Sequence, residues 1–226
     1  MNGATISADI ISYTSLDELD RRNIENKIKG LLAHLTKKYK GDAFFGRIIQ
    51  GDYIECAIKT SKNALRIALL LKTFVKSIEP KHSSDTKGLK YYKEHGLRLA
   101  LAVAPLTTID PKKGIIDGEA IYMSGRAIKD YSTSNKKKIV IKNTMAFCSS
   151  DQVVQEQFDT IFALLDTIIS RCSAKQCEVI YHRLLGLSES EVSEKLQKYQ
   201  STISQHSTSA GWQSIDKAVN YFEKYI

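Results

Sequence analysis

Two aspartates stand at positions from which their carboxylates could hold a metal ion. Asp9 ends an apolar, β-prone run that begins at Ala4, and Asp52 follows Gly51 in a two-residue turn between two more such runs. Mg²⁺ prefers oxygen ligands and is usually bound through one or two carboxylates plus substrate phosphates. Both residues also occur without a ligand, as a cap and as part of a hairpin turn. From these residues alone, both interpretations stay open.

The hydrophobic spacing predicts elements that would bring these aspartates together. The order β-α-β-β-α-β, followed by α-β, is that of the palm-like relative of the ferredoxin fold, in which helices cover one face of an antiparallel sheet. Its first strand lies beside the central hairpin, so we expect both carboxylates at one edge of the sheet. The predicted strands are residues 4–11, 44–50, 53–59, 97–104 and 138–141, the helices 16–39, 60–77 and 119–131, and the connections a surface loop 79–96 and a turn-rich stretch 107–118.

The remaining sequence predicts an all-α segment. An amphipathic helix at 153–170 precedes a helix capped by Ser173, a stop at Gly186 and a second helix after Ser188. A short turn leads to a third helix from Gln200, which is the spacing of a helix-turn-helix. The predicted fold class is therefore α+β, with a palm domain at 1–147, a connecting helix at 148–172 and a helix-turn-helix domain at 173–226.

Composition suits a soluble globular protein. The chain has 226 residues and 42% hydrophobic content, no run of 18 apolar residues and no basic-then-apolar leader. We therefore expect no membrane association and a cytoplasmic location. The cysteines lack metal-binding spacing, which argues against a zinc site or a disulfide framework and favours buried thiols at Cys56, Cys148, Cys172 and Cys177.

Three motifs carry a family resemblance. Asp9-Ile10-Ile11-Ser12-Tyr13-Thr14 resembles the Asp-Ile-x-Gly-Phe-Thr motif that opens class III nucleotidyl cyclase domains, and Gly51-Asp52 is similar to their second metal-binding motif. Residues 118–126 resemble the family's Gly-x-x-Val-Asn-x-Ala-x-Arg helix start. With the helix-turn-helix behind it, the chain looks like the SatD-like group.

The resemblance implies roles for individual residues. Asp9 and Asp52 would hold two Mg²⁺ or Mn²⁺ ions, and Arg126 would be the transition-state cation, since a guanidinium offers several donors and a permanent charge to phosphate oxygens. Taken on its residues alone, Arg126 is equally well a solvated charge on a helix surface. The backbone that would approach the triphosphate of a purine nucleotide is that of Ile10, Ile11, Ser12 and Tyr13.

The chain departs from the family where the base and ribose are held. Tyr122 stands at the position of the ribose-orienting asparagine, and Ile115 stands where adenylyl-specific members carry a polar residue. Gly46 does not supply the base-selecting lysine, although Arg47 is adjacent. Groups that handle phosphate are retained while groups that handle the base are missing. We therefore expect nucleotide or polyphosphate binding more than efficient cyclisation.

In such a helix-turn-helix domain, the third helix enters the DNA major groove, where amides and hydroxyls can contact bases or phosphates. Residues 173–226 hold six Lys/Arg and six Asp/Glu, against 27 and 19 upstream, so this segment is neutral. Because DNA affinity depends largely on phosphate neutralisation, we expect a homodimer to be needed. The alternative is a helical protein-interaction module. The candidate DNA-binding residues are Lys198, Gln200, Ser201, Thr202, Ser204, Gln205 and His206.

The sequence thus favours a cytoplasmic, DNA-binding transcriptional regulator whose degenerate cyclase-like domain binds a nucleotide or another phosphorylated ligand. The first alternative is an active, metal-dependent nucleotidyl cyclase or nucleotidyltransferase that uses its helix-turn-helix for localisation or dimerisation. A third possibility is a catalytically inactive scaffold. The retained Asp9, Asp52 and Arg126 favour the enzyme, whereas the missing base-reading residues favour the regulator.

Overall fold

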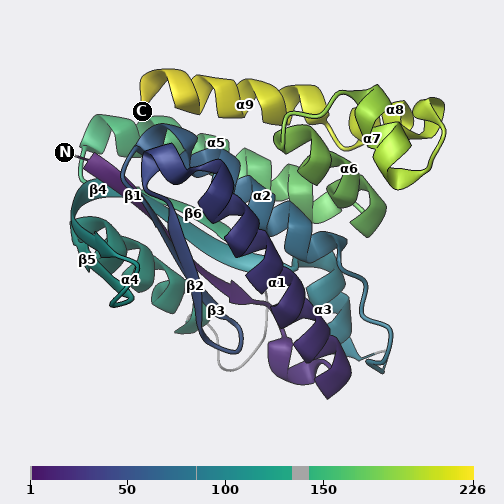
Figure 1. Cartoon of the computed structure of the whole chain (residues 1–226), viewed down its shortest axis with the longest axis horizontal. Helices are drawn as coiled ribbons and strands as arrows, with labels where there is room; N and C mark the ends of the chain where they lie inside the picture. The colour runs from purple at the N-terminus through teal and green to yellow at the C-terminus, as the bar shows by residue number, and fades with distance from the viewer. Residues whose placement is uncertain (1, 85, 134–142) are drawn as a thin grey trace.

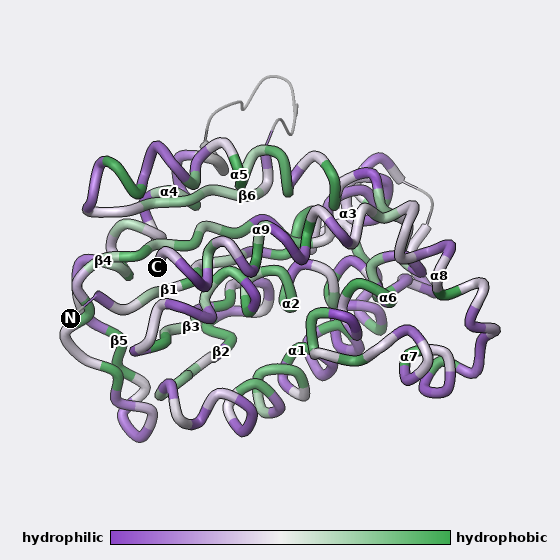
Figure 2. Tube along the Cα trace, turned by 90° about the horizontal axis from the view of Figure 1, so that it is seen from above, coloured by the Kyte–Doolittle hydropathy of each residue, from purple (hydrophilic) through white to green (hydrophobic). Residues whose placement is uncertain are grey.

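A mostly antiparallel sheet lies at the centre of the computed structural model, which describes residues 2–84, 86–133 and 143–226. Its strands run in the order β2-β3-β1-β4-β5, and β6 pairs with β4 in parallel (Figure 1). β4 is hydrophobic along most of its length (Figure 2), as expected for a strand with neighbours on both sides. The strands are β1 (Asn2–Ile10), β2 (Phe45–Gln50), β3 (Tyr53–Ile58), β4 (Leu97–Asp110), β5 (Ile115–Gly118) and β6 (Met145–Ser149).

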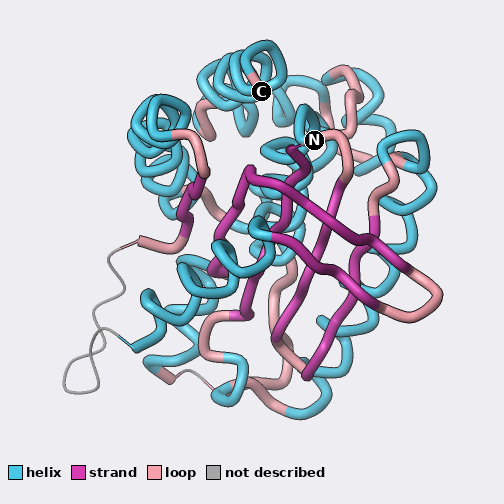
Figure 3. Tube along the Cα trace, turned by 90° about the vertical axis from the view of Figure 1, so that its left-hand side faces the viewer, coloured by secondary structure: helices cyan, strands magenta, loops and turns pink. Residues whose placement is uncertain are grey.

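Helices cover both faces of this sheet (Figure 3). Side chains alternate between the faces along β1, so Ala4, Ile6 and Ala8 join the core formed with α1 (Glu18–Lys38) and α2 (Ala64–Ser77). On the opposite face lies α4 (Glu119–Thr133), whose Ser124 Oγ is 3.0 Å from Thr5 Oγ1 and 2.9 Å from Ser7 Oγ. The expectation that helices cover one face therefore describes α1 and α2 but is wrong for α4.

Further helices form a layer that packs on β6 through α5 (Gln152–Arg171) and on α2 through α6 (Ala174–Leu184). The others are α7 (Glu189–Leu196), α8 (Gln200–Ser209) and α9 (Trp212–Tyr225). Ser173 and Ser188 close capping boxes at the starts of α6 and α7, as their spacing predicts. α6 packs on α2, and Arg66 Nε of α2 lies 2.6 Å from Glu223 Oε1 of α9. One continuous hydrophobic core runs from β1 to Phe222.

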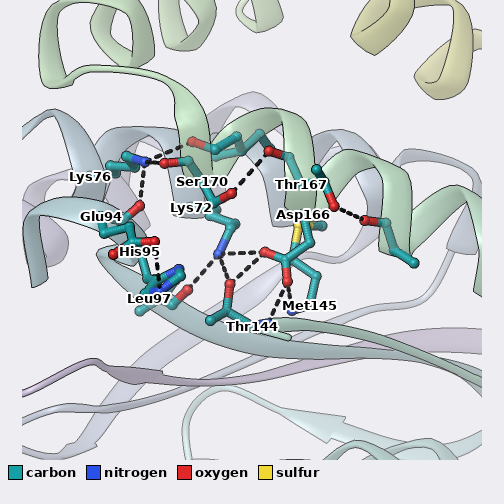
Figure 4. Close-up of polar contacts among 12 residues, drawn as sticks. Lys72, Lys76, Glu94, His95, Leu97, Thr144, Met145, Asp166, Thr167 and Ser170 are labelled. Atoms are coloured by element: carbon teal, nitrogen blue, oxygen red, sulfur yellow. Dashed lines mark hydrogen bonds and ion pairs between the residues drawn. The ribbon is translucent and has the colours of Figure 1, made fainter. Parts of the chain in front are cut away.

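A buried lysine connects this layer to the sheet (Figure 4). Lys72 Nζ of α2 donates to Leu97 O at 2.8 Å and to Thr144 Oγ1 at 2.6 Å, and it lies 3.4 Å from Asp166 Oδ1 of α5. Asp166 in turn accepts hydrogen bonds from the Thr144 N–H and hydroxyl. Burial lowers the pKa of Lys72, and the Asp166 carboxylate opposes that shift. The network therefore ties α2, α5 and the starts of β4 and β6 together.

Three sequence predictions need correction or fall outside the structure. Part of the expected 79–96 loop is a helix, α3 (Lys87–His95), because Thr86 caps it and Tyr92 is buried, its hydroxyl donating to Val75 O at 3.0 Å. The stretch 107–118 is not only turns, since β4 continues to Asp110 and pairs with β5. The strand expected at 138–141 lies outside the described residues. Short 3-10 turns occupy η1 (Tyr13–Ser15), η2 (Lys40–Asp42) and η3 (Ser61–Asn63).

Two further observations concern membrane-spanning helices and thiols. Within the described residues, no helix has both the length and the apolar character needed to span a bilayer. Cys56, Cys172 and Cys177 are buried free thiols, as predicted, whereas Cys148 is only half-buried.

Candidate functional site

Asp9 and Asp52 lie at the same edge of the sheet. Asp9 pairs with Tyr53 across the β1–β3 ladder, and the Ile10 N–H donates to Asp52 O at 3.1 Å. The turn that carries Asp52 requires glycine before it, because Gly51 has a φ of +44° and a Cβ there would lie 3.3 Å from the Tyr13 ring. A local turn and a tight contact with Tyr13 therefore fix where Asp52 sits.

The electrostatics of this pair favour a cation. Burial raises the pKa of Asp9, the nearby Asp52 charge raises it further, and the Arg98 guanidinium partly opposes both. Burial also raises the pKa of Asp52. Asp9 Oδ1 is buried without a hydrogen-bond partner, and the whole Asp9 side chain is 23% exposed. An unpartnered buried carboxylate oxygen costs free energy that a bound cation would offset.

The donor set limits which ion could bind there. Among residues 2–84, 86–133 and 143–226, no group of three or more His, Cys, Asp or Glu side chains could hold a metal. Two carboxylates with an unsatisfied oxygen fit a hard ion such as Mg²⁺ or Mn²⁺ that takes its other ligands from water and a phosphorylated ligand. They do not fit a structural site made by the protein alone.

The loop after Asp9 is held by its own contacts. The Ile11 N–H donates to Gly96 O at 3.0 Å, and the Ile10 N–H donates to Asp52 O. Ser12 has a left-handed backbone with φ of 56°, at the position where the cyclase motif has glycine. Of the four backbone groups that the resemblance assigned to phosphate, those of Ile10 and Ile11 are therefore already satisfied, and a phosphate would have to use Ser12 and Tyr13.

Tyr13 is oriented over this edge by α1. Its hydroxyl donates to the Glu25 carboxylate, and the Arg21 guanidinium lies 5.7 Å from the centre of its ring. Burial and the Glu25 hydrogen bond together raise the pKa of Tyr13 to about 12. The phenol therefore stays neutral near pH 7, and its ring packs against Gly51 in the turn that carries Asp52.

Arg126 does not face the aspartates within one chain. Ser124, two residues earlier on α4, contacts β1, whereas Arg126 is exposed. Side chains two positions apart lie on opposite sides of a helix. The Tyr122 hydroxyl is 2.9 Å from Asp117 Oδ1, and Ile115 begins β5 with its side chain exposed. Of the residues that the cyclase motifs mark, the structure thus brings Asp9, Asp52 and Tyr13 together and leaves Arg126 apart.

The candidate DNA-binding residues divide between two sides of α8. Gln200, Ser201 and Gln205 are exposed, and Ser204 is half-buried. Thr202 and His206 instead line a cavity together with Lys198, from the turn before α8. Ile203 packs on Val179 and Val192, which holds α8 against α6 and α7. The exposed polar face of α8 is therefore narrower than the sequence indicated.

Sequence reasoning missed one side chain at the sheet edge and one hydroxyl where α4 packs on β1. Arg98 Nη1 lies 3.5 Å from Asp9 Oδ2, and it was visible as the only charge in the apolar run 97–104. Ser124, the hydroxyl between α4 and β1, was visible as a small polar residue on an otherwise apolar helix face. Neither signal reveals its partner, because strand register decides which residues meet.

Comparison with known proteins adds only distant likenesses. No protein-family model and no curated protein matches this chain. Two solved structures of a bacterial light-regulated adenylyl cyclase are similar to it. One shows 14% identity and a TM-score of 0.42 over 65% of this chain and 43% of that chain, less than half of its length. The other shows 13% identity and a TM-score of 0.43 over 65% of this chain and 74% of that chain.

Proposed function

We propose that this chain is a cytoplasmic DNA-binding transcriptional regulator with a palm-like cyclase-related domain at residues 1–147. A connecting helix, 148–172, leads to a helix-turn-helix domain at 173–226. The observation that carries the proposal is the exposed polar face of α8, presented after the short turn that follows α7.

The arrangement of α6 to α8 supports DNA recognition. Val179, Val192 and Ile203 form a small core of their own, so the three helices hold a fixed mutual geometry. The turn before α8 contains Gln197 in a left-handed conformation, φ 52°, and α8 then begins with Gln200 and Ser201 exposed. In a helix-turn-helix, formed here by α7 and α8, the N-terminal residues of the second helix contact base edges. Gln200, Ser201 and Gln205 are therefore the proposed base-contacting residues, and Ser204 flanks them.

Charge determines how such a module would bind. With six Lys/Arg against six Asp/Glu, residues 173–226 have no surplus to neutralise DNA phosphates. The proposal therefore requires full-length protein as a homodimer, in which two modules contact two half-sites. An exposed Arg126 that faces away from Asp9 also suits a dimer, since it would reach a ligand phosphate only in the second copy.

Binding of full-length protein to random-sequence and selected duplexes, followed by fluorescence anisotropy at several salt concentrations, tests this function. Replacing Gln200 and Gln205 with alanine should reduce the preference for the selected duplex by at least tenfold. Replacing Gln213, an exposed glutamine on α9, is the matched control and should change nothing. Absence of DNA binding at low salt would mean that 173–226 is a protein-interaction module.

The palm-like domain would supply ligand sensing. Asp9 and Asp52 would hold Mg²⁺ or Mn²⁺, and the Ser12 and Tyr13 backbone would meet the phosphates of a purine nucleotide or a related ligand. The unpartnered Asp9 Oδ1 and the raised pKa values of both carboxyl groups support this placement.

A second candidate function is an active nucleotidyl cyclase or nucleotidyltransferase. The proximity of Asp9 and Asp52, close enough that one charge shifts the pKa of the other, favours it. The Tyr122 hydroxyl engaged by Asp117, and Arg126 turned away from the pair, count against it.

A further inference from the structure

Basic side chains from separate parts of the chain meet at one cavity of about 460 Å³. Lys27 comes from α1, Lys81 from the segment after α2, Lys175 from the first turn of α6, and Lys198 from the turn before α8. His206 of α8 completes the basic lining. We call this space the seam cavity, because it lies between the sheet-bearing part of the chain and the helices α6 to α8.

The lysines of the seam cavity carry unneutralised charge. Within the described residues, none of these four ammonium groups forms an ion pair. Two glutamates, Glu79 and Glu178, also line the cavity, so the lining is positive by two charges with His206 neutral. Like charges directed at a shared space repel one another unless an anion lies between them. The charge pattern therefore selects an anionic occupant.

Neutral donors in the same wall suit phosphate oxygens. Thr202, which carries a hydroxyl, and Ala174, the first residue of α6, form part of its lining. The capping box uses the Gln176 N–H, whereas the first N–H groups of a helix have no partner inside the helix. The positive end of the α6 dipole adds to the lysine charges.

We propose that the seam cavity binds a small phosphorylated molecule. Its volume falls in the range of about 300–1,000 Å³ that is typical of small-ligand sites. A DNA duplex is too wide to enter such a concave space, so the occupant is a free phosphate compound with two or more phosphoryl charges. Lys175 of α6 and Lys198 of the turn before α8 would hold those charges.

Occupancy would have a regulatory consequence, which rests on the proposed function. Lys198, Thr202 and His206 belong both to the seam cavity and to the candidate DNA-binding set. Of these, Lys198 is exposed, so a phosphorylated ligand held in the cavity would engage a lysine that DNA phosphates would otherwise contact. The ligand and DNA would therefore compete, and ligand binding would weaken DNA binding.

Calorimetric titration of full-length protein with inorganic triphosphate, in low salt with EDTA, tests the proposal directly. The chelator keeps a cation-dependent site at Asp9 and Asp52 out of the measurement. We expect binding with one triphosphate per chain, weakened at least tenfold by the double replacement Lys175→Gln and Lys198→Gln. The matched control, Lys217→Gln with Lys224→Gln on exposed positions of α9, removes the same charge and should leave the affinity within twofold.

Each other outcome of these titrations either supports or overturns the proposal that the seam cavity binds a phosphorylated molecule. Absence of triphosphate binding, or equal weakening in both double variants, would overturn the proposal, because general surface charge would then explain any signal. Retained unfolding midpoints in both variants confirm that each is folded. A short DNA duplex titrated in parallel separates the two proposals. If the natural protein binds triphosphate but not the duplex, the proposal for the seam cavity stands and only the DNA-binding function is removed. Duplex binding that depends on Lys175 and Lys198, without any triphosphate binding, would assign these lysines to DNA and overturn the cavity site.

Discussion

Asp9 and Arg98 face each other across β1 and β4, with Arg98 Nη1 3.5 Å from Asp9 Oδ2. This distance exceeds that of a strong charge-assisted hydrogen bond, so the guanidinium lowers the pKa of Asp9 without satisfying its second oxygen. Arg98 therefore has two effects at the sheet edge: it favours the ionised form of Asp9 against the effect of burial, and its own positive charge opposes a metal ion.

The first prediction follows from this opposition. Replacing Arg98 with glutamine should tighten Mn²⁺ binding by about three- to tenfold at pH 8, because a competing positive charge is removed. Replacing Asp52 with asparagine should weaken it by at least tenfold. Electron paramagnetic resonance of free Mn²⁺ measures both changes, and Arg22→Gln, on the exposed surface of α1, is the control. Unchanged affinity in Asp52→Asn would remove the metal role from this pair.

A second prediction concerns turnover. With Mg²⁺ or Mn²⁺ and ATP or GTP, the purified protein should form little or no cyclic nucleotide. Tyr122 is hydrogen-bonded to Asp117, and loss of substrate positioning alone can cost orders of magnitude in rate. Chromatographic detection of 3′,5′-cyclic product over several hours is a sufficient measurement. Robust product that disappears in Asp52→Ala would instead establish the enzyme.

Local patterns predicted most of the elements, and the exceptions have physical reasons. Capping residues and apolar spacing located α6, α7 and α8 to within about two residues, because these signals act within a few positions. α3 was missed because its buried side chains, Leu89 and Tyr92, are surrounded by polar residues. It is stabilised by tertiary contacts such as the Tyr92 hydroxyl on Ile78 O, 3.2 Å away, which spacing does not reveal.

For a related reason, the sequence does not predict which distant residues contact one another. The aspartates at the sheet edge were predicted to lie together because, in the β-α-β-β-α-β order, the first strand lies beside the central hairpin. Lys72 and Asp166 are 94 positions apart, and the sequence shows only a lysine in one helix and an aspartate in another. They become partners because α5 packs beside α2. The seam cavity was hidden in the same way, since its lysines come from separate segments.

The third prediction uses this buried pair. Replacing Asp166 with alanine should lower the free energy of unfolding by about 3–5 kcal/mol, because it leaves the Lys72 ammonium buried without its carboxylate. The double variant Lys72→Met, Asp166→Leu should recover part of that loss, since neither charge then needs a partner. Urea unfolding followed by circular dichroism gives both values. Asp159→Ala, at an exposed position of α5, should change stability by less than about 0.5 kcal/mol. A double variant no more stable than Asp166→Ala would show that packing, rather than charge, dominates the site.

The last prediction concerns acid and His182. This side chain is buried in α6, its Nδ1 has no hydrogen-bond partner, and burial with the nearby Lys195 charge lowers its pKa to about 4. The ordinary value in an unfolded chain is about 6.5. Between these two values the unfolded chain binds a proton that the folded chain does not, so stability should fall as the pH is lowered through this window. A tenfold change in proton affinity corresponds to about 1.4 kcal/mol, so this residue should contribute a loss of about 2–3 kcal/mol by pH 4.

Urea unfolding at pH 7.5, 6 and 5 tests this prediction. The free energy of unfolding should decline less in His182→Gln than in the natural protein. His34→Gln, on the exposed side of α1, is the control and should follow the natural protein. An identical decline in all three proteins would mean that other groups take up the protons.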